Sequence, residues 1–490
     1  MVIQNLLDSL PDSAVLLSDG QRQLDRAAVA EQVARFVGLL AARTRPEVPV
    51  GILADNSPDW LLVDLATQQL GLTLVPLPLF FTPQQWMHVI VESGIGALFC
   101  ADPAQGAALG FGEVLDIGGS LALCESSQAP RTAPLDGVQK LTFTSGTTSA
   151  PKGVCLSTQQ QWDVASALRE GVAPLGLERH LCLLPFAVLL ENIAGPYTAL
   201  LSGATTICPP LAEVGMRGAS GFDPAVCLDA IARHAPHSIT LVPQMLQALV
   251  AAARPDDPRI ASLRFVAVGG GKMPPQLLAA ARARGFPVYE GYGLSECASV
   301  VALNLPGAQR DGSVGQPLAH RRVEIAPDGE ILVESCRARY LGLPAQEEAW
   351  LATGDLGHLD SDGFLFVDGR KKDILITGYG RNVSPEWPES LLLGTGLFAQ
   401  AIVVGEAQPF LGALLVPARA DLAPAQLQQA VERVNALLPD YAQVRRWRAV
   451  PPFIPSTGLL TANGRLRRAA IRDAHADLIA SLFDQPESST

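Results

Sequence analysis

Metal-binding cysteine motifs are absent from the sequence. Its 8 cysteines are scattered over 490 residues, with no Cys-x-x-Cys pair and no cluster of histidines. This distribution argues against a structural zinc site and against a dense disulfide framework. We therefore expect buried, reduced thiols and a cytoplasmic protein.

Long apolar segments are lacking as well. Residues 1–8 have neither the basic region nor the long apolar stretch of a signal peptide. The most apolar run, residues 181–190, ends at Glu191 and is too short to cross a bilayer. We therefore expect no integral membrane segment.

Positive charge is in short supply. The 36 basic and 48 acidic residues give a net charge of −12, which is unfavourable for binding nucleic acid or an anionic membrane surface. Hydrophobic residues make up 48% and charged residues 17%, the balance of a well-packed chain, and the length predicts two or more domains. Any phosphorylated ligand must therefore be held by local positive charge.

The order of predicted elements indicates an α/β fold. A strand is expected within residues 48–53, followed by a helix that Ser57 caps and Pro58 begins. Strand and helix signals go on alternating as far as Tyr289, which predicts mostly parallel sheets covered by helices. After Gly312, short β-like runs separated by Asp-Gly turns predict a small antiparallel subdomain. We divide the chain into a large domain, residues 1–371, and a small α+β domain, residues 372–490.

A loop rich in hydroxyls and glycine occupies residues 144–153, Thr-Ser-Gly-Thr-Thr-Ser-Ala-Pro-Lys-Gly. It follows a predicted strand at 138–143 and contains one cation, Lys152, and no acid. Backbone N–H groups, hydroxyls and a lysine together suit a polyphosphate. An ordinary solvated turn is the alternative, and the position of Lys152 does not fit the GxxxxGK[ST] phosphate loop.

Two glycine-containing segments follow predicted strands in the middle of the chain. The glycines at 269–271 permit a close backbone approach to a flat ring. Residues 291–296 offer Tyr292 as a stacking face, Ser295 as a hydroxyl and Glu296 as a lone carboxylate suited to Mg²⁺ beside phosphates. A core tyrosine and ordinary turns are the structural alternatives for these segments taken singly.

Polar residues suited to a sugar come later in the chain. Asp355 ends the sequence Thr-Gly-Asp at 353–355, where we expect it after a turn, and a carboxylate can accept hydrogen bonds from both ribose hydroxyls. Arg370 can bind the same sugar or a phosphate. Taken singly, the Gly-Asp pair is explained by an ordinary turn and Arg370 by a solvated run of charges. All these segments occurring together in this order favour a nucleotide site.

Together with residues 51–60, Gly-Ile-Leu-Ala-Asp-Asn-Ser-Pro-Asp-Trp, these segments resemble the adenylate-forming superfamily of acyl-CoA synthetases, firefly-type luciferases and peptide-synthetase adenylation domains. The resemblance covers nearly the whole length. Residues 369–385 and 460–468 are most similar to long-chain fatty acyl-CoA synthetases. The resemblance implies that the C-terminal domain is a mobile lid that turns at a hinge, Lys372.

The resemblance also implies roles for individual residues. It assigns catalysis to Arg465, Thr144, Lys152 and Glu296, with Glu296 as the Mg²⁺ ligand. It assigns ATP or AMP binding to Thr144, Ser145, Gly146, Thr147, Thr148, Lys152, Gly270, Gly271, Tyr292, Gly293, Ser295, Asp355 and Arg370. It places an acyl pocket at Phe186, Val188, Leu189, Val242, Gly269 and Gly291.

The reaction implied by the resemblance is ATP-dependent activation of a carboxylic acid to an acyl-adenylate, followed by transfer to CoA. Such an enzyme is an AMP-forming acid–thiol ligase. The apolar residues at 186–190, with no acid placed to hold an α-ammonium group, favour a hydrophobic fatty or aryl acid. The alternative acceptor is an acyl carrier protein or another nucleophile. Because no Asp-Ser attachment motif follows Arg468, we expect any such carrier to be a separate protein.

Departures from the family pattern occur at Ser149, where relatives have glycine, at Val188, where histidine is usual, and at Arg465. Relatives place the lysine that bridges the substrate carboxylate and the α-phosphate at the position of Arg465. Arginine keeps the charge but is bulkier and planar. Three interpretations stay open: Arg465 serves as the lysine does, it supports slower adenylation, or the chain is a catalytically impaired acyl- or nucleotide-binding homologue.

Overall fold

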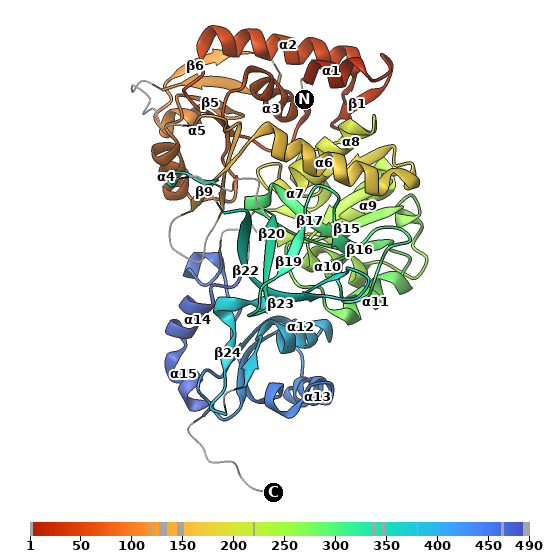
Figure 1. The fold of residues 1–490 in the computed structure, drawn as a ribbon, viewed down its shortest axis with the longest axis vertical. Coiled ribbons are helices and arrows are strands. Elements are labelled where there is room, and N and C mark those ends of the chain that lie inside the picture. The colour runs from red at the N-terminus through yellow and green to blue at the C-terminus, as the bar shows by residue number, and fades with distance from the viewer. Residues whose placement is uncertain are drawn as a thin grey trace, which may run out of the picture.

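The computed structural model describes residues 3–117, 119–126, 135–144, 151–218, 221–334, 339–344, 348–379, 381–461 and 465–483. It confirms the predicted α/β fold. A large N-terminal domain of two sheets and their helices lies above a smaller C-terminal domain in Figure 1. Within the described ranges, no helix has the length and apolar character needed to cross a membrane.

The first large sheet has parallel strands at its centre and antiparallel strands at its edges. The expected strands at 48–53 and 138–143 are present as β3 and β8. In order across the sheet, its strands are β21 (Arg339–Tyr340), β9 (Lys152–Leu156), β8 (Lys140–Thr144), β4 (Leu74–Pro76), β3 (Val50–Leu53), β5 (Ala97–Cys100), β7 (Ala122–Glu125) and β6 (Glu113–Asp116).

The second large sheet is parallel from β16 to β1, and its remaining edge strands are antiparallel. In order across the sheet, its strands are β18 (Gln316–Pro317), β17 (Ser299–Leu303), β16 (Val288–Leu294), β15 (Phe265–Val268), β14 (Ser238–Leu241), β10 (Arg179–Leu181), β11 (Thr205–Ile207), β1 (Val15–Ser18) and β2 (Gln23–Asp25).

Helices cover both sheets and fill the space between them. The largest hydrophobic core lies between the sheets and includes α2 (Arg26–Arg43), α3 (Pro58–Leu70) and α6 (Thr158–Val172). Helix α3 begins as predicted, with the Ser57 side chain accepting a hydrogen bond from the Trp60 N–H. The outer faces are covered by α4 (Pro83–Ser93) on the first sheet and by α9 (Pro224–His234), α10 (Pro243–Ala252) and α11 (Pro275–Ala283) on the second.

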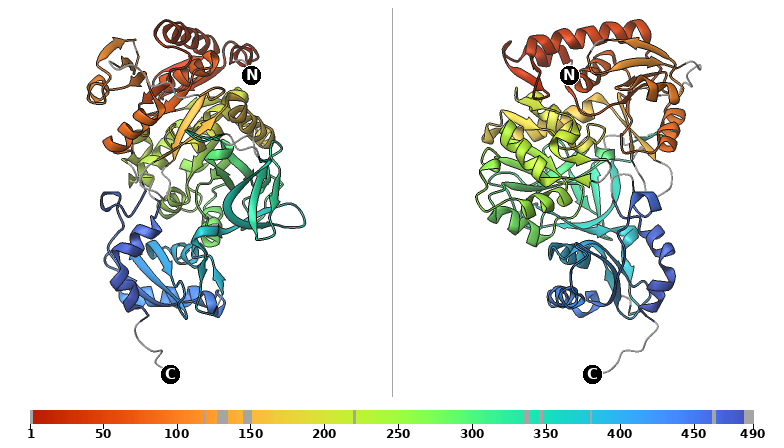
Figure 2. Two further views of the ribbon diagram at one scale, coloured as in Figure 1. Left: turned by 60° about the vertical axis from the view of Figure 1, so that its left-hand side comes forward. Right: turned by 180° about the vertical axis from the view of Figure 1, so that it is seen from behind.

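The predicted small antiparallel sheet follows the second large sheet. Its strands are β19 (Val323–Ile325), β20 (Glu330–Glu334), β22 (Trp350–Leu359) and β23 (Leu365–Arg370). Figure 2 shows the C-terminal domain beyond it as a compact unit, and two hydrophobic cores belong to that domain alone. Its elements are α12 (Glu386–Gly394), β26 (Phe398–Val404), β27 (Leu411–Pro417), α13 (Pro424–Asn435), β28 (Val444–Ala449), α14 (Arg468–Ala474) and α15 (Ala476–Ser481).

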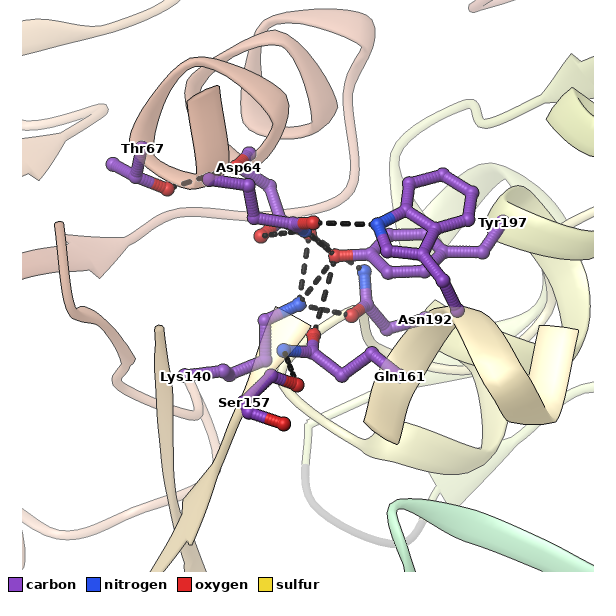
Figure 3. A network of polar contacts seen from close by, with 9 residues as sticks. Asp64, Thr67, Lys140, Ser157, Gln161, Asn192 and Tyr197 are labelled. Atoms are coloured by element: carbon purple, nitrogen blue, oxygen red, sulfur yellow. Dashed lines mark hydrogen bonds and ion pairs between the residues drawn. The ribbon is translucent and has the colours of Figure 1, made fainter. Parts of the chain in front are cut away.

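A buried polar network connects strand β8 of the first sheet with the helical segments that carry Asp64, Asn192 and Tyr197 (Figure 3). Lys140, at the start of β8, has its Nζ atom 2.9 Å from Asp64 Oδ2 of α3 and donates to Asn192 Oδ1 at 2.5 Å and to the Tyr197 hydroxyl at 2.8 Å. The Lys140 and Asp64 side chains are 1% and 0% exposed. Burial lowers the pKa of Lys140, and the charge of Asp64 opposes that shift. The network fixes the strand whose other end, Thr144, begins the hydroxyl-rich loop.

Replacing Lys140 with methionine leaves Asp64 as an unpaired buried charge, so we expect a loss of about 3–5 kcal/mol in the free energy of unfolding. Urea denaturation followed by circular dichroism measures it. The double variant Lys140→Met/Asp64→Leu removes both charges and regains most of the loss. Arg419→Met, which breaks only an exposed pair with Asp421, is the control and changes stability little. Equal stability of Lys140→Met and the wild type would contradict a stabilising role for the Lys140–Asp64 pair.

Candidate active site

Two glycine-containing segments meet at the carboxyl ends of parallel strands. Residues 269–271 follow β15, and residues 291–296 lie at the end of its neighbour β16. This edge of an open α/β sheet is where such folds place ligands. A Cβ atom built on Gly270 would lie 3.6 Å from Val242 Cγ1 and 3.8 Å from Leu190 Cδ2. The structure thus brings Val242 and Gly269 of the expected acyl pocket next to Gly270, and adds Leu190, which that list omits.

The carboxylate of Asp355 is the centre of the polar contacts here. It is 4% exposed, accepts a hydrogen bond from the Tyr292 hydroxyl at 2.6 Å, and lies 2.7 Å from Arg370 Nε. Burial raises the pKa of Asp355, while Arg370 and Tyr292 oppose that rise. Each carboxylate oxygen has two lone pairs, so both can accept further hydrogen bonds.

The segment carrying Asp355 is a bulge inside β22, and the prediction of an acid placed after a turn is wrong. Strand β20 pairs Glu330 with Leu356 and Leu332 with Ala352, so 353–355 lie opposite Ile331 alone. Gly354 takes a φ of 73°, which glycine adopts without strain. The Thr353 hydroxyl donates to Ile331 O at 2.8 Å and the Gly354 N–H to Glu330 Oε1 at 2.8 Å. The bulge re-aims the Asp355 side chain.

Gly291 and Gly293 lie within β16, which continues to Leu294, and the prediction that residues 291–296 follow the strand is wrong for this part. A Cβ atom on Gly293 would collide with the carbonyl oxygen of Ser299 on β17, and one on Gly291 would lie 2.9 Å from Leu303 Cδ1. Close packing between β16 and β17 therefore accounts for both glycines. Their expected contacts with nucleotide and acyl group stay predictions.

Glu296 is a half-buried carboxylate in a short 3₁₀ helix, Ser295–Cys297. The Tyr340 hydroxyl donates to its Oε1, while its Oε2 accepts no hydrogen bond from the described residues. Mg²⁺ often takes a single protein carboxylate, with substrate phosphates and waters completing its shell. A half-buried carboxylate with a free oxygen fits that role.

Among the described residues, His180, Cys182 and Glu191 form a fully buried cluster of side chains of the kinds that bind metals. The sequence, with no clustered histidines, gave no sign of it. Glu191 Oε1 lies 2.8 Å from His180 Nε2, and Glu191 Oε2 accepts from the N–H groups of Leu183 and Leu184 at 3.1 and 2.8 Å. These internal hydrogen bonds explain the carboxylate as a structural one.

Arg465 brings a positive charge from the C-terminal domain to the glycine loop. Its Nη2 donates to the carbonyl oxygen of Gly270 at 2.9 Å. Desolvation by the surrounding protein and the charge of Arg370 lower the pKa of Arg465, whereas Glu386 and Asp355 raise it. A guanidinium keeps its charge at neutral pH. Glu386, at the start of α12, is a charged neighbour that sequence reasoning missed.

The hydroxyl-rich loop joins the antiparallel strands β8 and β9. Thr144 pairs with Lys152 across them; Thr144 is half-buried and Lys152 is exposed. After β9 comes α6, which begins at Thr158 with Ser157 as its N-cap. Ser145, Gly146, Thr147 and Thr148 lie outside the described residues.

Comparison with known families decides the wider assignment. The profile of the AMP-binding enzyme family matches residues 5–335, and that of the AMP-binding enzyme C-terminal domain matches residues 372–487. The chain belongs to the AMP-binding enzyme family. The predicted superfamily is thereby confirmed.

Individual relatives of this AMP-binding enzyme include aryl and fatty acid ligases. It is 32% identical to a 2-succinylbenzoate–CoA ligase of Geobacillus kaustophilus, over 81% of this chain and 82% of that protein. A match to long-chain-fatty-acid–CoA ligase FadD15 of Mycobacterium bovis is 33% identical but covers only 42% of this chain and 39% of the relative. The fold matches the anthranilate–CoA ligase AuaEII in complex with anthranoyl-AMP, with a TM-score of 0.80, 21% identity, and coverage of 98% of each chain.

The remaining expected site residues of this AMP-binding enzyme differ in how far they are buried. Phe186 is 2% exposed and packs against Trp60 with ring centroids 5.3 Å apart, so it belongs to the core between the sheets. Leu189 is 5% exposed, and Val188 before it is half-buried. Lys372, the expected hinge, is exposed in the 3₁₀ helix Lys371–Asp373.

A buried carboxyl on β16 predicts a pH dependence of stability. Burial raises the pKa of Glu290 from its ordinary value of 4.5 to about 8, opposed by the Met273 N–H and by Lys272. The folded state then holds a proton that the unfolded chain releases, so the contribution of Glu290 to stability is greatest at low pH and is lost as the pH rises towards 8.

We expect the free energy of unfolding of the wild type to fall, relative to Glu290→Gln, between about pH 5 and 8, by at most about 1.4 kcal/mol per pH unit. Urea denaturation of both proteins at several pH values measures the difference. A difference that stays constant over this range would show that Glu290 is ionised throughout.

Proposed function

We propose that this AMP-binding enzyme is an acid–thiol ligase that uses ATP to activate a hydrophobic fatty or aryl carboxylic acid and transfers the acyl group to CoA. The observation that carries the proposal is the meeting of Arg465 with Gly270, beside the Tyr292–Asp355–Arg370 cluster. Arg465 thus brings a cation of the C-terminal domain to the glycine loop, where it interacts electrostatically with the carboxylate of Asp355.

Two displacements make up the proposed reaction. A carboxylate oxygen of the acid attacks the α-phosphorus of ATP, and the bond from that phosphorus to the pyrophosphate oxygen breaks. The CoA thiolate then attacks the acyl carbonyl carbon, and AMP leaves with the electrons of the carbon–oxygen bond. The first step brings one anion towards another, so the protein contributes mainly fixed positive charge and hydrogen-bond donors.

The chain's own residues divide this work. Arg465 offsets the charge that builds up between the acid and the α-phosphate. Lys152, with Thr144 and the adjoining hydroxyl-rich loop, holds the outer phosphates. Asp355 and Arg370 bind the ribose. Glu296 holds the Mg²⁺ that accompanies ATP, and this ion neutralises phosphate charge when it is bound.

The acid is proposed to be apolar because of what surrounds the glycine loop. The side chains of Leu190 and Val242 flank Gly270. Gly269 has no side chain and contributes only backbone atoms to this surface. Curated relatives are named for 2-succinylbenzoate and for long-chain fatty acids, which supports an aryl or fatty acid. A separate acyl carrier protein stays the alternative acceptor.

A non-catalytic binding protein is the second candidate, because Arg465 stands where relatives carry lysine. Exchange of labelled pyrophosphate into ATP, screened over fatty, aryl and amino acids, separates the two. We expect exchange with fatty or aryl acids and none with α-amino acids, and CoA to accept the acyl group in a direct assay. No exchange with any acid would favour the binding protein.

Arg465→Ala tests the role of the arginine. We expect acid-dependent exchange to fall about 10²- to 10³-fold, because a charge aimed at the transition state is lost. ATP binding, measured by calorimetry, should be largely kept, since the other nucleotide contacts lie in the N-terminal domain. Arg465→Lys is the matched variant and retains measurable exchange. Full exchange by Arg465→Ala would refute the assigned role.

A further inference from the structure

The side chain of Tyr340 connects two parts of the site that come from different sheets. Tyr340 lies on β21, which pairs with β9 so that Tyr340 is opposite Val154. The Leu341 N–H donates to Gly153 O at 2.8 Å, which holds β21 against the strand that begins at Lys152. From this edge the Tyr340 hydroxyl donates to Glu296 Oε1, on the second sheet's side.

The geometry assigns Tyr340 as a positioning residue for the metal ligand Glu296, an inference that rests on the proposed function. Its hydroxyl donates to Oε1, and no other described residue donates to Oε2, which can therefore accept a cation. Hydrogen bonds of this kind orient ligating carboxylates, and their loss typically weakens metal binding. Tyr340 also fixes the distance between Glu296 and the strand that carries Lys152. The cation at Glu296 and the phosphates at Lys152 are therefore held at a fixed separation.

The Tyr340 hydroxyl is the donor in this contact. A phenol is protonated at neutral pH, and an ionised carboxylate has no proton to donate, so Glu296 is the acceptor.

Tyr340→Phe keeps the ring and removes only the hydroxyl. Binding of Mn²⁺ to the protein with a non-hydrolysable ATP analogue, followed by electron paramagnetic resonance, reports on the metal without turnover. We expect the Mn²⁺ affinity to fall about 10- to 100-fold, while binding of the analogue in EDTA is unchanged. Tyr441→Phe, at a tyrosine 41% exposed on the C-terminal domain, is the matched control and leaves Mn²⁺ binding unchanged.

A double-mutant cycle separates positioning from general structure. If Tyr340 acts through Glu296, Tyr340→Phe has no further effect on Mn²⁺ affinity in a Glu296→Gln background. Additive losses, or unchanged affinity in Tyr340→Phe alone, would overturn the inference. Unchanged affinity in Glu296→Gln alone would instead refute the proposed metal ligand, so the two failures are distinguishable. Thermal unfolding midpoints within a few degrees of the wild type show that both variants are folded.

Discussion

The buried carboxylate of Asp355 is the constraint on which the site depends. A carboxylate that is 4% exposed needs partners, and it finds them in Tyr292 of β16 and Arg370 of β23. These contacts fix the small antiparallel sheet against the end of the second large sheet. Asp355 also favours the charged form of Arg465, a residue of the C-terminal domain.

Two of the segments that lead to the proposed site are supported by ion pairs. The strand that leads to the hydroxyl-rich loop begins at Lys140 and its buried pair with Asp64. Three residues after Arg465, Arg468 donates to Glu389 Oε1 at 2.7 Å, and its Nε lies 3.9 Å from Asp373, next to the expected hinge. These pairs hold the backbone of both segments in place, so the charged side chains near them need little reorganisation when a ligand binds.

Local chemistry made much of this arrangement predictable. Ser57 and Pro58 mark the start of α3 because cap and ring geometry are encoded in adjacent residues. The glycines at 269–271 follow a strand, β15, as the sequence predicts. The bulge at 353–355, the Glu296–Tyr340 hydrogen bond and the buried Lys140 pair were not predictable, because each depends on strands or helices that pair across long stretches of sequence. Gly293 shows a different limit of the sequence. A glycine needed for close strand packing and a glycine needed for ligand binding look the same in the sequence, so the sequence alone does not distinguish the two roles.

The central claim is that Asp355, the glycine loop at 269–271 and Arg465 bind the same acyl-adenylate molecule. The most direct test is a crystal structure with an acyl-sulfamoyl adenosine, a stable mimic of that intermediate. The account predicts ribose hydroxyls hydrogen-bonded to Asp355, the sulfamoyl group within reach of Arg465, and the acyl chain beside Leu190 and Val242. Adenosine bound away from Asp355, with Arg465 turned out of the site, would contradict it.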